Sequence, residues 1–422
     1  MTTLAYRADS AKRQCDSPQS MARDTRVVGP PGGIWPAVVF ILLLMLAGCQ
    51  TGRGDGGGDG GYSFGTPLPQ TLGRDYGEAS GEKIKIALLL PLSNTDPKVR
   101  TIAQSLKEAA ELALFDFNNP AIELVQKDTR GTSAGARFAA EEAINEGAQL
   151  ILGPLRAQAA TAAGQVAQPR GVPVISFSST ESVAGNGVYL LSFLPSVEVE
   201  RMVSFSIGRG LKRFAALVPA HAYGNVVAGD LTRIVEEQGA TLFTVERFGA
   251  QAGDTEQSVK RIAQLSSRVD ALMLAEGDPA LRKIAQGLGS VAGLQLIGTG
   301  LWNDPAIVSE PALAGAWFPG PAPGTRQVFE DRFRATYGRP PAAIASLGYD
   351  AVSLAAALAR APAGYRFSAE QLTDPNGFAG VDGLFRFRSD GRIERSLAIL
   401  QVTPQGFQMV DAPRQSFAGT NF

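Results

Sequence analysis

Cysteine and histidine are scarce in this sequence of 422 residues. The two cysteines are Cys15 and Cys49, and the single histidine is His221. A Cys/His metal cluster needs several such ligands, and a catalytic triad could use only His221. The sequence also lacks the GxSxG motif, the GxxxxGK[ST] motif and a GxGxxG motif after a strand. These absences argue against an enzyme, and they predict neither a metal nor a cofactor.

An excess of charge of either sign is also missing. The chain has 39 basic and 40 acidic side chains and a formal net charge of −1. The sequence therefore predicts no nucleic-acid partner and no general attraction to anionic lipid. Apolar residues make up 45% of the chain, which is normal for a globular protein, and the length is sufficient for two lobes of ordinary size.

An export signal precedes the globular part of the sequence. Arg23 and Arg26 are followed by the apolar run 34–46, which is too short to span a bilayer comfortably but suits a signal peptide. The letters LAGC then end at Cys49 and resemble the lipobox of bacterial lipoproteins. We therefore predict that the signal peptide 1–48 is removed and that Cys49 is lipidated. A signal anchor that stays uncleaved is the alternative.

Two details of this region concern the start and the location of the protein. Met21 would begin a signal peptide of more usual length than Met1, so either residue could be the true start. Gln50 follows the lipidated position, where an aspartate would favour the inner membrane in lipoproteins of double-membrane bacteria. The resemblance thus implies a periplasmic protein anchored to the inner leaflet of the outer membrane. Residues 49–82 include the tract TGRGDGGGDGG and are expected to form a flexible tether.

From Lys83 onward, predicted strands and helices alternate. Continuous apolar runs such as IKIALLLPL are expected of strands that are buried on both faces. The first series has expected strands at 84–92, 122–127, 150–152 and 172–177, and helices at 99–117, 133–146 and 157–167. The second series has expected strands at 214–218, 242–247, 271–275 and 294–297, and helices at 225–238, 255–265 and 278–288.

Strands separated by helices imply parallel sheets with helices on both faces. The two series predict an α/β protein of two doubly wound parallel-sheet lobes, with a ligand-type cleft where the C-terminal ends of the strands meet. Helices at 325–337 and 342–359, and a hairpin of 384–387 with 396–402, indicate a chain that crosses between the lobes several times. The expected boundaries are 83–196 plus 324–362 for lobe 1, 197–323 plus 363–412 for lobe 2, and 413–422 for a tail.

This arrangement resembles the type I periplasmic binding proteins, the group that includes leucine/isoleucine/valine receptors, over about residues 83–410. The matching landmarks are LLLPLSN, which contains Ser93, and ILGPL, VPVISFSST and HAYGN. Within that group, KDTRGT, GTGLWND, LAGAWFPG, YDAVSLAAALAR and GFAGVDGLFRFRSDG are similar to the lipoproteins called penicillin-binding-protein activators. That resemblance implies a protein that stimulates a bifunctional peptidoglycan synthase.

The resemblance also implies a ligand site. In amino-acid receptors, hydroxyl and backbone N–H groups bind the ligand carboxylate, an aromatic ring covers the ligand, and an acidic side chain binds the ammonium group. Ser178 and Thr180 match the hydroxyl-bearing loop, and Tyr223 matches the aromatic ring. Ala157 stands where the receptors have serine, and no acid lies at 300–302, so the amino-acid clamp is expected to be incomplete. Further candidates for the cleft are Ser93, Arg156, Ser176 and Trp302.

Each of these candidates also has a plainer structural interpretation. Ser176 and Ser178 could satisfy backbone groups of the loop after a strand. Tyr223 could pack at the start of a helix, and Trp302 could pack between the lobes. Arg156 could bind an anion at a helix N-terminus or be solvated.

Three hypotheses for function follow. The leading one is a lipid-anchored periplasmic protein that binds a bifunctional penicillin-binding protein and activates it by preferring its active conformation. The alternative is a tethered receptor that delivers a small molecule, such as a branched-chain amino acid, to an ABC importer. A cell-wall enzyme is the third, but the sequence offers no nucleophile or metal-ligand constellation for it.

Overall fold

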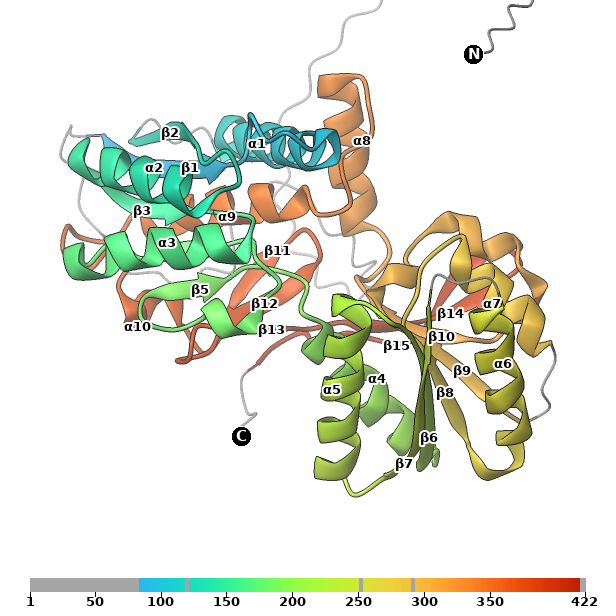
Figure 1. Cartoon of the computed structure of the whole chain (residues 1–422). Helices are drawn as coiled ribbons and strands as arrows, with labels where there is room; N and C mark the ends of the chain where they lie inside the picture. The colour runs from blue at the N-terminus through green and yellow to red at the C-terminus, as the bar shows by residue number, and fades with distance from the viewer. Residues whose placement is uncertain (1–82, 118–120, 250–252, 290–292, 418–422) are drawn as a thin grey trace, which may run out of the picture. The chain divides into compact units, whose positions relative to one another are not determined.

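The computed structural model describes residues 83–117, 121–249, 253–289 and 293–417. The predicted signal peptide, the lipidation site Cys49 and the predicted tether lie outside the described residues. The described part forms two α/β lobes (Figure 1). No helix in these ranges is long and apolar enough to cross a membrane.

Lobe 1 contains a five-stranded parallel sheet. Its strands, in spatial order, are β2 (Ile122–Asp128), β1 (Ile84–Leu90), β3 (Ala148–Leu152), β4 (Val174–Ser176) and β5 (Val188–Leu190). The covering helices are α1 (Pro97–Phe117) and α9 (Ser346–Leu358) on one face, and α2 (Ser133–Asn145) and α3 (Ala157–Ala167) on the other. Successive side chains of a strand point to opposite faces of the sheet. Leu88 therefore packs on the side of α1 and α9, and Leu89 packs on the side of α2 and α3.

Lobe 2 contains a seven-stranded sheet. Its strands, in spatial order, are β15 (Gly406–Asp411), β14 (Ala398–Thr403), β10 (Trp317–Gly320), β9 (Gln295–Gly298), β8 (Ala271–Leu274), β6 (Arg213–Pro219) and β7 (Thr241–Phe248). The strands from β10 to β7 are parallel, and β14 and β15 are antiparallel to their neighbours. The covering helices are α4 (Pro195–Gly208) and α5 (Ala222–Glu237) on one face, and α6 (Asp254–Gln264) and α7 (Ala280–Leu288) on the other.

The structure confirms the predicted fold class of two α/β lobes with parallel sheets. Lobe 2 also has one core on each face of its sheet. Ala216 of β6 packs toward α5, and the next residue, Leu217, packs toward α6. Helix α2 has Thr132 as its N-cap. Its hydroxyl accepts the Gly135 N–H at 3.0 Å.

The C-terminal part departs from the predicted boundaries. It forms α8 (Thr325–Tyr337), α10 (Ala369–Leu372) and a small antiparallel sheet of β11 (Phe378–Gly380), β12 (Gly383–Phe387) and β13 (Ile393–Arg395). The core of lobe 1 includes Phe367, Phe385 and Ile393. Residues 367–393 therefore pack on lobe 1 because their aromatic and aliphatic side chains complete its core. This corrects the expected boundary, which places them in lobe 2.

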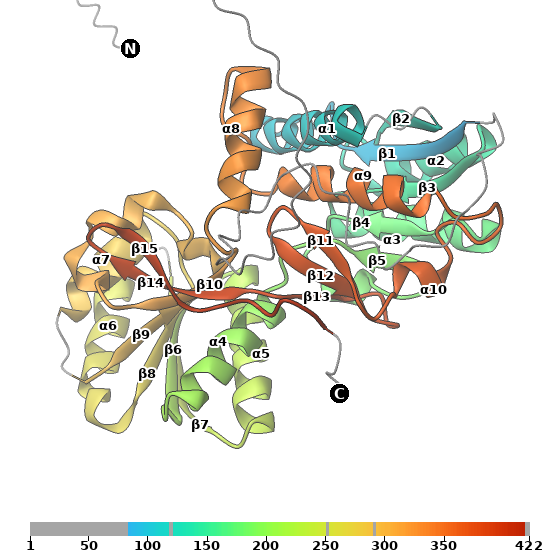
Figure 2. The same ribbon diagram turned by 180° about the vertical axis from the view of Figure 1, so that it is seen from behind.

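The predicted late hairpin also has a different second strand. β12 pairs with β13, and residues 398–403 join the lobe 2 sheet as β14. The predicted tail is not free of the body either, since Phe417 is buried beside Gly377 and lies 4.6 Å from the Arg386 guanidinium. The chain thus passes between the lobes after β5, after β10, after β13 and again after β15 (Figure 2).

Candidate functional site

A cavity of about 350 Å³ is lined by both lobes and by the segments that connect them. Leu155 and Phe177 of lobe 1 line it just beyond the C-terminal ends of β3 and β4, where parallel sheets bind their ligands. The rest of its apolar lining is Phe193, Pro195, Leu301, Pro319, Pro321, Ala343, Ile344 and Leu397. We call this space the interlobe cavity, and its walls suit an apolar group of a ligand.

Glu198 brings a carboxylate to the interlobe cavity. It lies in the first turn of α4, and its Oε2 accepts a hydrogen bond from the Gly300 N–H at 2.9 Å. Burial raises the pKa of Glu198 to about 7, although that hydrogen bond and the Arg395 guanidinium oppose the rise. Its Oε1 accepts no hydrogen bond from the described residues. A cationic group of a ligand would therefore meet a carboxylate oxygen of a partly buried glutamate here.

Tyr223 is the one sequence-predicted site residue that lines the interlobe cavity. Its hydroxyl donates to Thr299 Oγ1 at 2.8 Å. Burial raises the pKa of the Tyr223 hydroxyl, and the nearby Glu198 carboxylate adds to the rise. Gly224 allows this placement, because a Cβ there would lie 2.0 Å from the Pro219 carbonyl oxygen at the end of β6. The start of α5 thus approaches β6 closely and directs Tyr223 to the cavity.

The loop after β4 uses most of its hydroxyl groups internally. The Ser176 hydroxyl donates to the Pro154 carbonyl at 2.9 Å and accepts the Ser178 N–H at 3.1 Å, and Ser178 Oγ accepts the Thr180 N–H at 3.2 Å. Ser176 and Ser178 are buried outside the cavity lining, which fits their structural interpretation. Ser179 lines the cavity instead, and within the described part its N–H and hydroxyl make no hydrogen bond. Thr180 is exposed and outside the lining.

Arg326 is the basic residue of the lining, but its guanidinium is already engaged. It donates to Asp382 Oδ1 at 2.6 Å, to Glu330 Oε1 at 2.9 Å and to the Ala343 carbonyl at 2.6 Å. Asp382 is buried and also accepts the Ser346 hydroxyl at 2.5 Å. Arg326 therefore stabilises lobe 1 beneath the cavity.

The other predicted site residues lie outside the interlobe cavity. The Ser93 hydroxyl donates to Asp128 at the ends of β1 and β2. Arg156 is exposed at the N-cap of α3. Trp302 is fully buried, and its Nε1–H donates to the Glu276 carbonyl at 3.0 Å, so it packs inside lobe 2 rather than between the lobes. In the described ranges, no three His, Cys, Asp or Glu side chains are grouped so that they could hold a metal ion.

Glu198 is the site residue that the sequence analysis missed. The resemblance to amino-acid receptors places the acidic residue of the second lobe at 300–302, where this sequence has none. The structure brings the Glu198 carboxylate to that place from 102 residues earlier in the chain. The only local signal is Pro195 followed by Glu198, a pattern that marks the start of a helix and says nothing of a cleft.

Comparisons with known proteins agree with this architecture. The sequence profile of a family described as periplasmic binding protein matches residues 83–407. A search of curated protein sequences gave no significant match. Similar solved structures include an ABC transporter substrate-binding protein from Sphaerobacter thermophilus, with a TM-score of 0.65 and 19% identity over 81% of this chain and 100% of that one.

Two further structures contain ligands. An ABC transporter substrate-binding protein from Desulfitobacterium hafniense in complex with leucine has a TM-score of 0.58 and 20% identity over 78% of this chain and all of that one. A solute-binding protein of an ABC transporter from Rhodopseudomonas palustris in complex with 3,4-dihydroxybenzoic acid has a TM-score of 0.59 and 18% identity. The match covers 80% of this chain and 98% of that one. At these identities, the likeness shows a shared fold.

Proposed function

Because the chain belongs to the periplasmic binding protein family, we propose that it is a receptor that takes an amino-acid-like solute into its interlobe cavity. Members of the family are solute-binding proteins rather than enzymes. The ligand is a small molecule with an apolar body, an ammonium group and a carboxylate. The receptor delivers it to an ABC importer, and the lipid at Cys49 holds the protein in the periplasm.

The Glu198 carboxylate is the observation on which this proposal rests. It lies in a cavity whose other lining is mostly apolar, and one of its oxygens has no donor among the described residues. A buried carboxylate is stabilised when a positive group pairs with it. An ammonium group of a ligand can supply that charge, because Arg326, the basic side chain of the lining, is engaged by Asp382 and Glu330.

Other parts of the cavity suit the rest of such a ligand. The N–H and hydroxyl of Ser179 are available for a carboxylate at the end of β4. Phe177, Phe193 and Leu301 can enclose an aliphatic or aromatic side chain. Leucine and 3,4-dihydroxybenzoic acid, the ligands of the two similar structures, both carry a carboxylate on a hydrocarbon frame.

Thermal unfolding with a panel of amino acids and aromatic acids tests this function. We expect at least one amino acid with an apolar side chain to raise the melting temperature, because a ligand that binds only the folded state stabilises it. Glu198→Gln should lose most of that shift, whereas Glu236→Gln, an exposed acid on α5, should keep it. The proposal is wrong if no amino acid stabilises the protein or if Glu198→Gln responds as well as the wild type.

Activation of a peptidoglycan synthase is the second candidate function. The phrases similar to penicillin-binding-protein activators support it, as do two large apolar side chains that lobe 1 exposes. Phe115 on α1 is 77% exposed and Phe138 on α2 is 68% exposed. Exposed aromatic residues are frequent anchors in protein interfaces. In this case the lipid at Cys49 anchors the protein to the outer membrane, and lobe 1 contacts the synthase.

A pull-down from detergent-solubilised membranes tests the second candidate. Specific retention of a bifunctional penicillin-binding protein, lost in Phe115→Ser/Phe138→Ser, would support it and would justify a glycan-polymerisation assay. Val328→Ser, which changes an exposed apolar residue on α8, is the control. Retention of an ABC permease instead would favour the solute receptor.

A further inference from the structure

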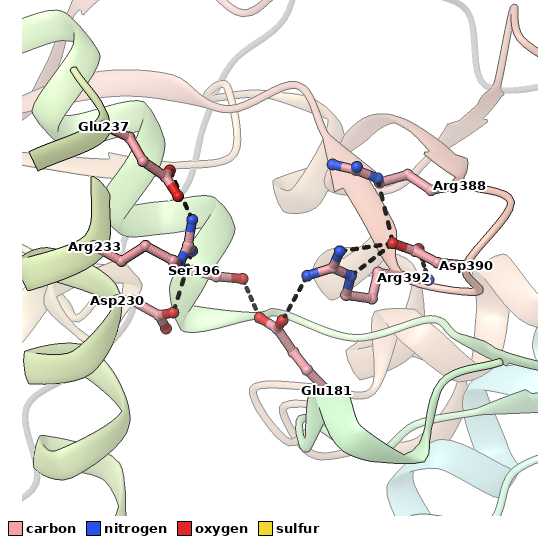
Figure 3. Close-up of polar contacts among 8 residues, drawn as sticks. All are labelled: Glu181, Ser196, Asp230, Arg233, Glu237, Arg388, Asp390 and Arg392. Atoms are coloured by element: carbon pink, nitrogen blue, oxygen red, sulfur yellow. Dashed lines mark hydrogen bonds and ion pairs between the residues drawn. The ribbon is translucent and has the colours of Figure 1, made fainter. Parts of the chain in front are cut away.

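A second and larger cavity, of about 530 Å³, lies beside the segments that connect the lobes. Its walls come from α4 and α5 of lobe 2, from the β12–β13 hairpin of lobe 1, and from the segment after β15. Of its lining residues, only Leu397 also lines the interlobe cavity. Figure 3 shows part of this region, with Arg233 on one side, Arg388 and Arg392 on the other, and Glu181 and Ser196 between them. We call this space the arginine cavity.

Carboxylates accept hydrogen bonds from half of the arginines in its lining. Arg233 donates to Glu237 at 2.9 Å, and Arg392 donates to Asp390 at 2.7 Å and to Glu181 at 3.3 Å (Figure 3). Arg201 pairs with Asp411 in the same way. These pairs fix the shape of the walls and leave little charge for a ligand. The six arginines of the lining are Arg201, Arg233, Arg388, Arg392, Arg395 and Arg414.

The other three arginines donate no hydrogen bond to a carboxylate in the described part of the chain. Arg388 and Arg414 form only longer ion pairs, at 3.7 Å with Asp390 and at 3.8 Å with Glu394, and both side chains are 56% exposed. Arg395 differs from them because it is only 6% exposed. Its Nη1 and Nη2 are buried without a hydrogen-bond partner among the described residues, and only its Nε is engaged, with the Ser192 carbonyl at 3.0 Å.

The Nη1 and Nη2 groups of Arg395 therefore lack hydrogen-bond acceptors among the described residues. Phe193 and Phe385 lie 4.7 and 5.4 Å from its guanidinium carbon and stack with it, but aromatic rings do not replace hydrogen-bond acceptors. Burial lowers the pKa of Arg395, although the Asp350, Asp382 and Glu198 carboxylates oppose the change. A buried guanidinium without acceptors is costly unless something supplies them.

We propose that the arginine cavity binds a small oxyanion, a ligand with phosphate or carboxylate groups, through Arg388, Arg395 and Arg414. Guanidinium groups match both kinds of oxyanion because they donate two parallel N–H bonds. Of the acidic residues in the lining, Glu200 alone forms no ion pair within the described part. The lining holds six arginines against four acidic residues, Glu200, Glu237, Glu394 and Asp411, so basic side chains outnumber acidic ones in it.

An anion bound in the arginine cavity would also affect the arrangement of the two lobes. One wall belongs to lobe 2 and the other to lobe 1, so an anion that contacts both favours the spacing of the lobes that it fits. Arg395 further contacts the carbonyl of Ser192, a residue that lines the interlobe cavity. A bound oxyanion would therefore act from outside the interlobe cavity, as an effector of the receptor.

Calorimetric titrations with sodium phosphate and with sodium citrate, each at constant ionic strength set by sodium chloride, test the proposal. The variant is Arg388→Gln/Arg414→Gln, whose exposed side chains can be changed without disturbing the core. The control is Arg170→Gln/Arg360→Gln, which removes the same charge from exposed positions outside the cavity. We expect saturable binding to the wild type and the control, and at least tenfold weaker binding to the variant.

The two titrations distinguish the source of the oxyanion. Binding of phosphate alone assigns a phosphate-bearing ligand, binding of citrate alone assigns a polycarboxylate, and binding of both assigns the oxyanion chemistry that they share. Binding in either titration supports the proposal if the arginine variant binds more weakly than the wild type. Absence of binding in both titrations, or equal binding by the wild type and the arginine variant, would overturn it.

Discussion

A hydrogen bond of 2.9 Å joins the Glu198 carboxylate to the Gly300 backbone N–H. The contact depends on the absence of a side chain at position 300, because a Cβ there would lie 2.4 Å from Glu198 Oε1. The first turn of α4 and the segment after β9 therefore meet through a carboxylate and a glycine. Together they place the one carboxylate in the lining of the interlobe cavity.

Gly300→Ala should displace the Glu198 carboxylate. We expect the free energy of unfolding to fall by about 1–3 kcal/mol, since a hydrogen bond to a charged group is lost in a partly buried place. Chemical denaturation measures this change. Gly277→Ala is the matched control, because a Cβ at position 277 would meet its nearest neighbour, Leu301, at an ordinary 3.8 Å. Equal effects of the two substitutions would show that the contact with Glu198 is unimportant.

Ligand binding should depend on pH through Glu198. Its pKa is about 7 in the folded protein, above its ordinary value of 4.5, so acidification removes the negative charge that an ammonium group needs. The affinity for an amino acid should therefore be full above pH 8 and fall up to about tenfold per pH unit below 7. Calorimetry between pH 5 and 8.5 measures this dependence. Glu198→Gln should bind weakly at every pH, and a wild-type affinity that is constant across this range would contradict the role of Glu198.

Trp302 should matter for stability and not for ligand contact. It is fully buried in lobe 2 beside Gly298, where a Cβ would lie 2.2 Å from the indole ring. Trp302→Ala should lower the free energy of unfolding by about 3–5 kcal/mol because it empties a packed core site. Trp302→Phe should cost less and should leave ligand affinity nearly unchanged in calorimetry. If a Trp302→Phe protein folds normally but no longer binds its ligand, Trp302 contributes to ligand binding and the prediction is wrong.

The Arg326–Asp382 pair should be a strong element of lobe 1. Asp382 is 1% exposed, so Arg326→Met leaves a buried carboxylate without its ion pair and should cost about 3–5 kcal/mol. Arg334→Met on the same helix breaks an exposed pair with Asp331 and should cost less than about 1 kcal/mol. A double-mutant cycle with Asp382→Asn should reveal a coupling of about 0.5–3 kcal/mol in urea denaturation. Strict additivity in this cycle would show that the two groups are independent.

Part of the fold is predictable from the sequence because its signals are local. Apolar runs such as residues 84–90 mark strands buried on both faces, and their alternation with helices predicts parallel sheets. The strands and helices depend on short stretches of chain, so neighbouring residues suffice to indicate them. The resemblance to amino-acid receptors implies that Tyr223 faces the cleft, and Tyr223 lines the interlobe cavity.

Features that join distant segments were decided only by the tertiary structure. Phe367, Phe385 and Ile393 complete the core of lobe 1 because their apolar surface fits there, and no local pattern distinguishes one lobe from the other. Glu198 reaches Gly300 across 102 residues, and Arg395 lies buried between segments that are far apart in the chain. The sequence by itself determined the elements and the fold class through local periodicity. The packing of non-local segments decided which side chains face each cavity, because that choice depends on shape and burial in three dimensions.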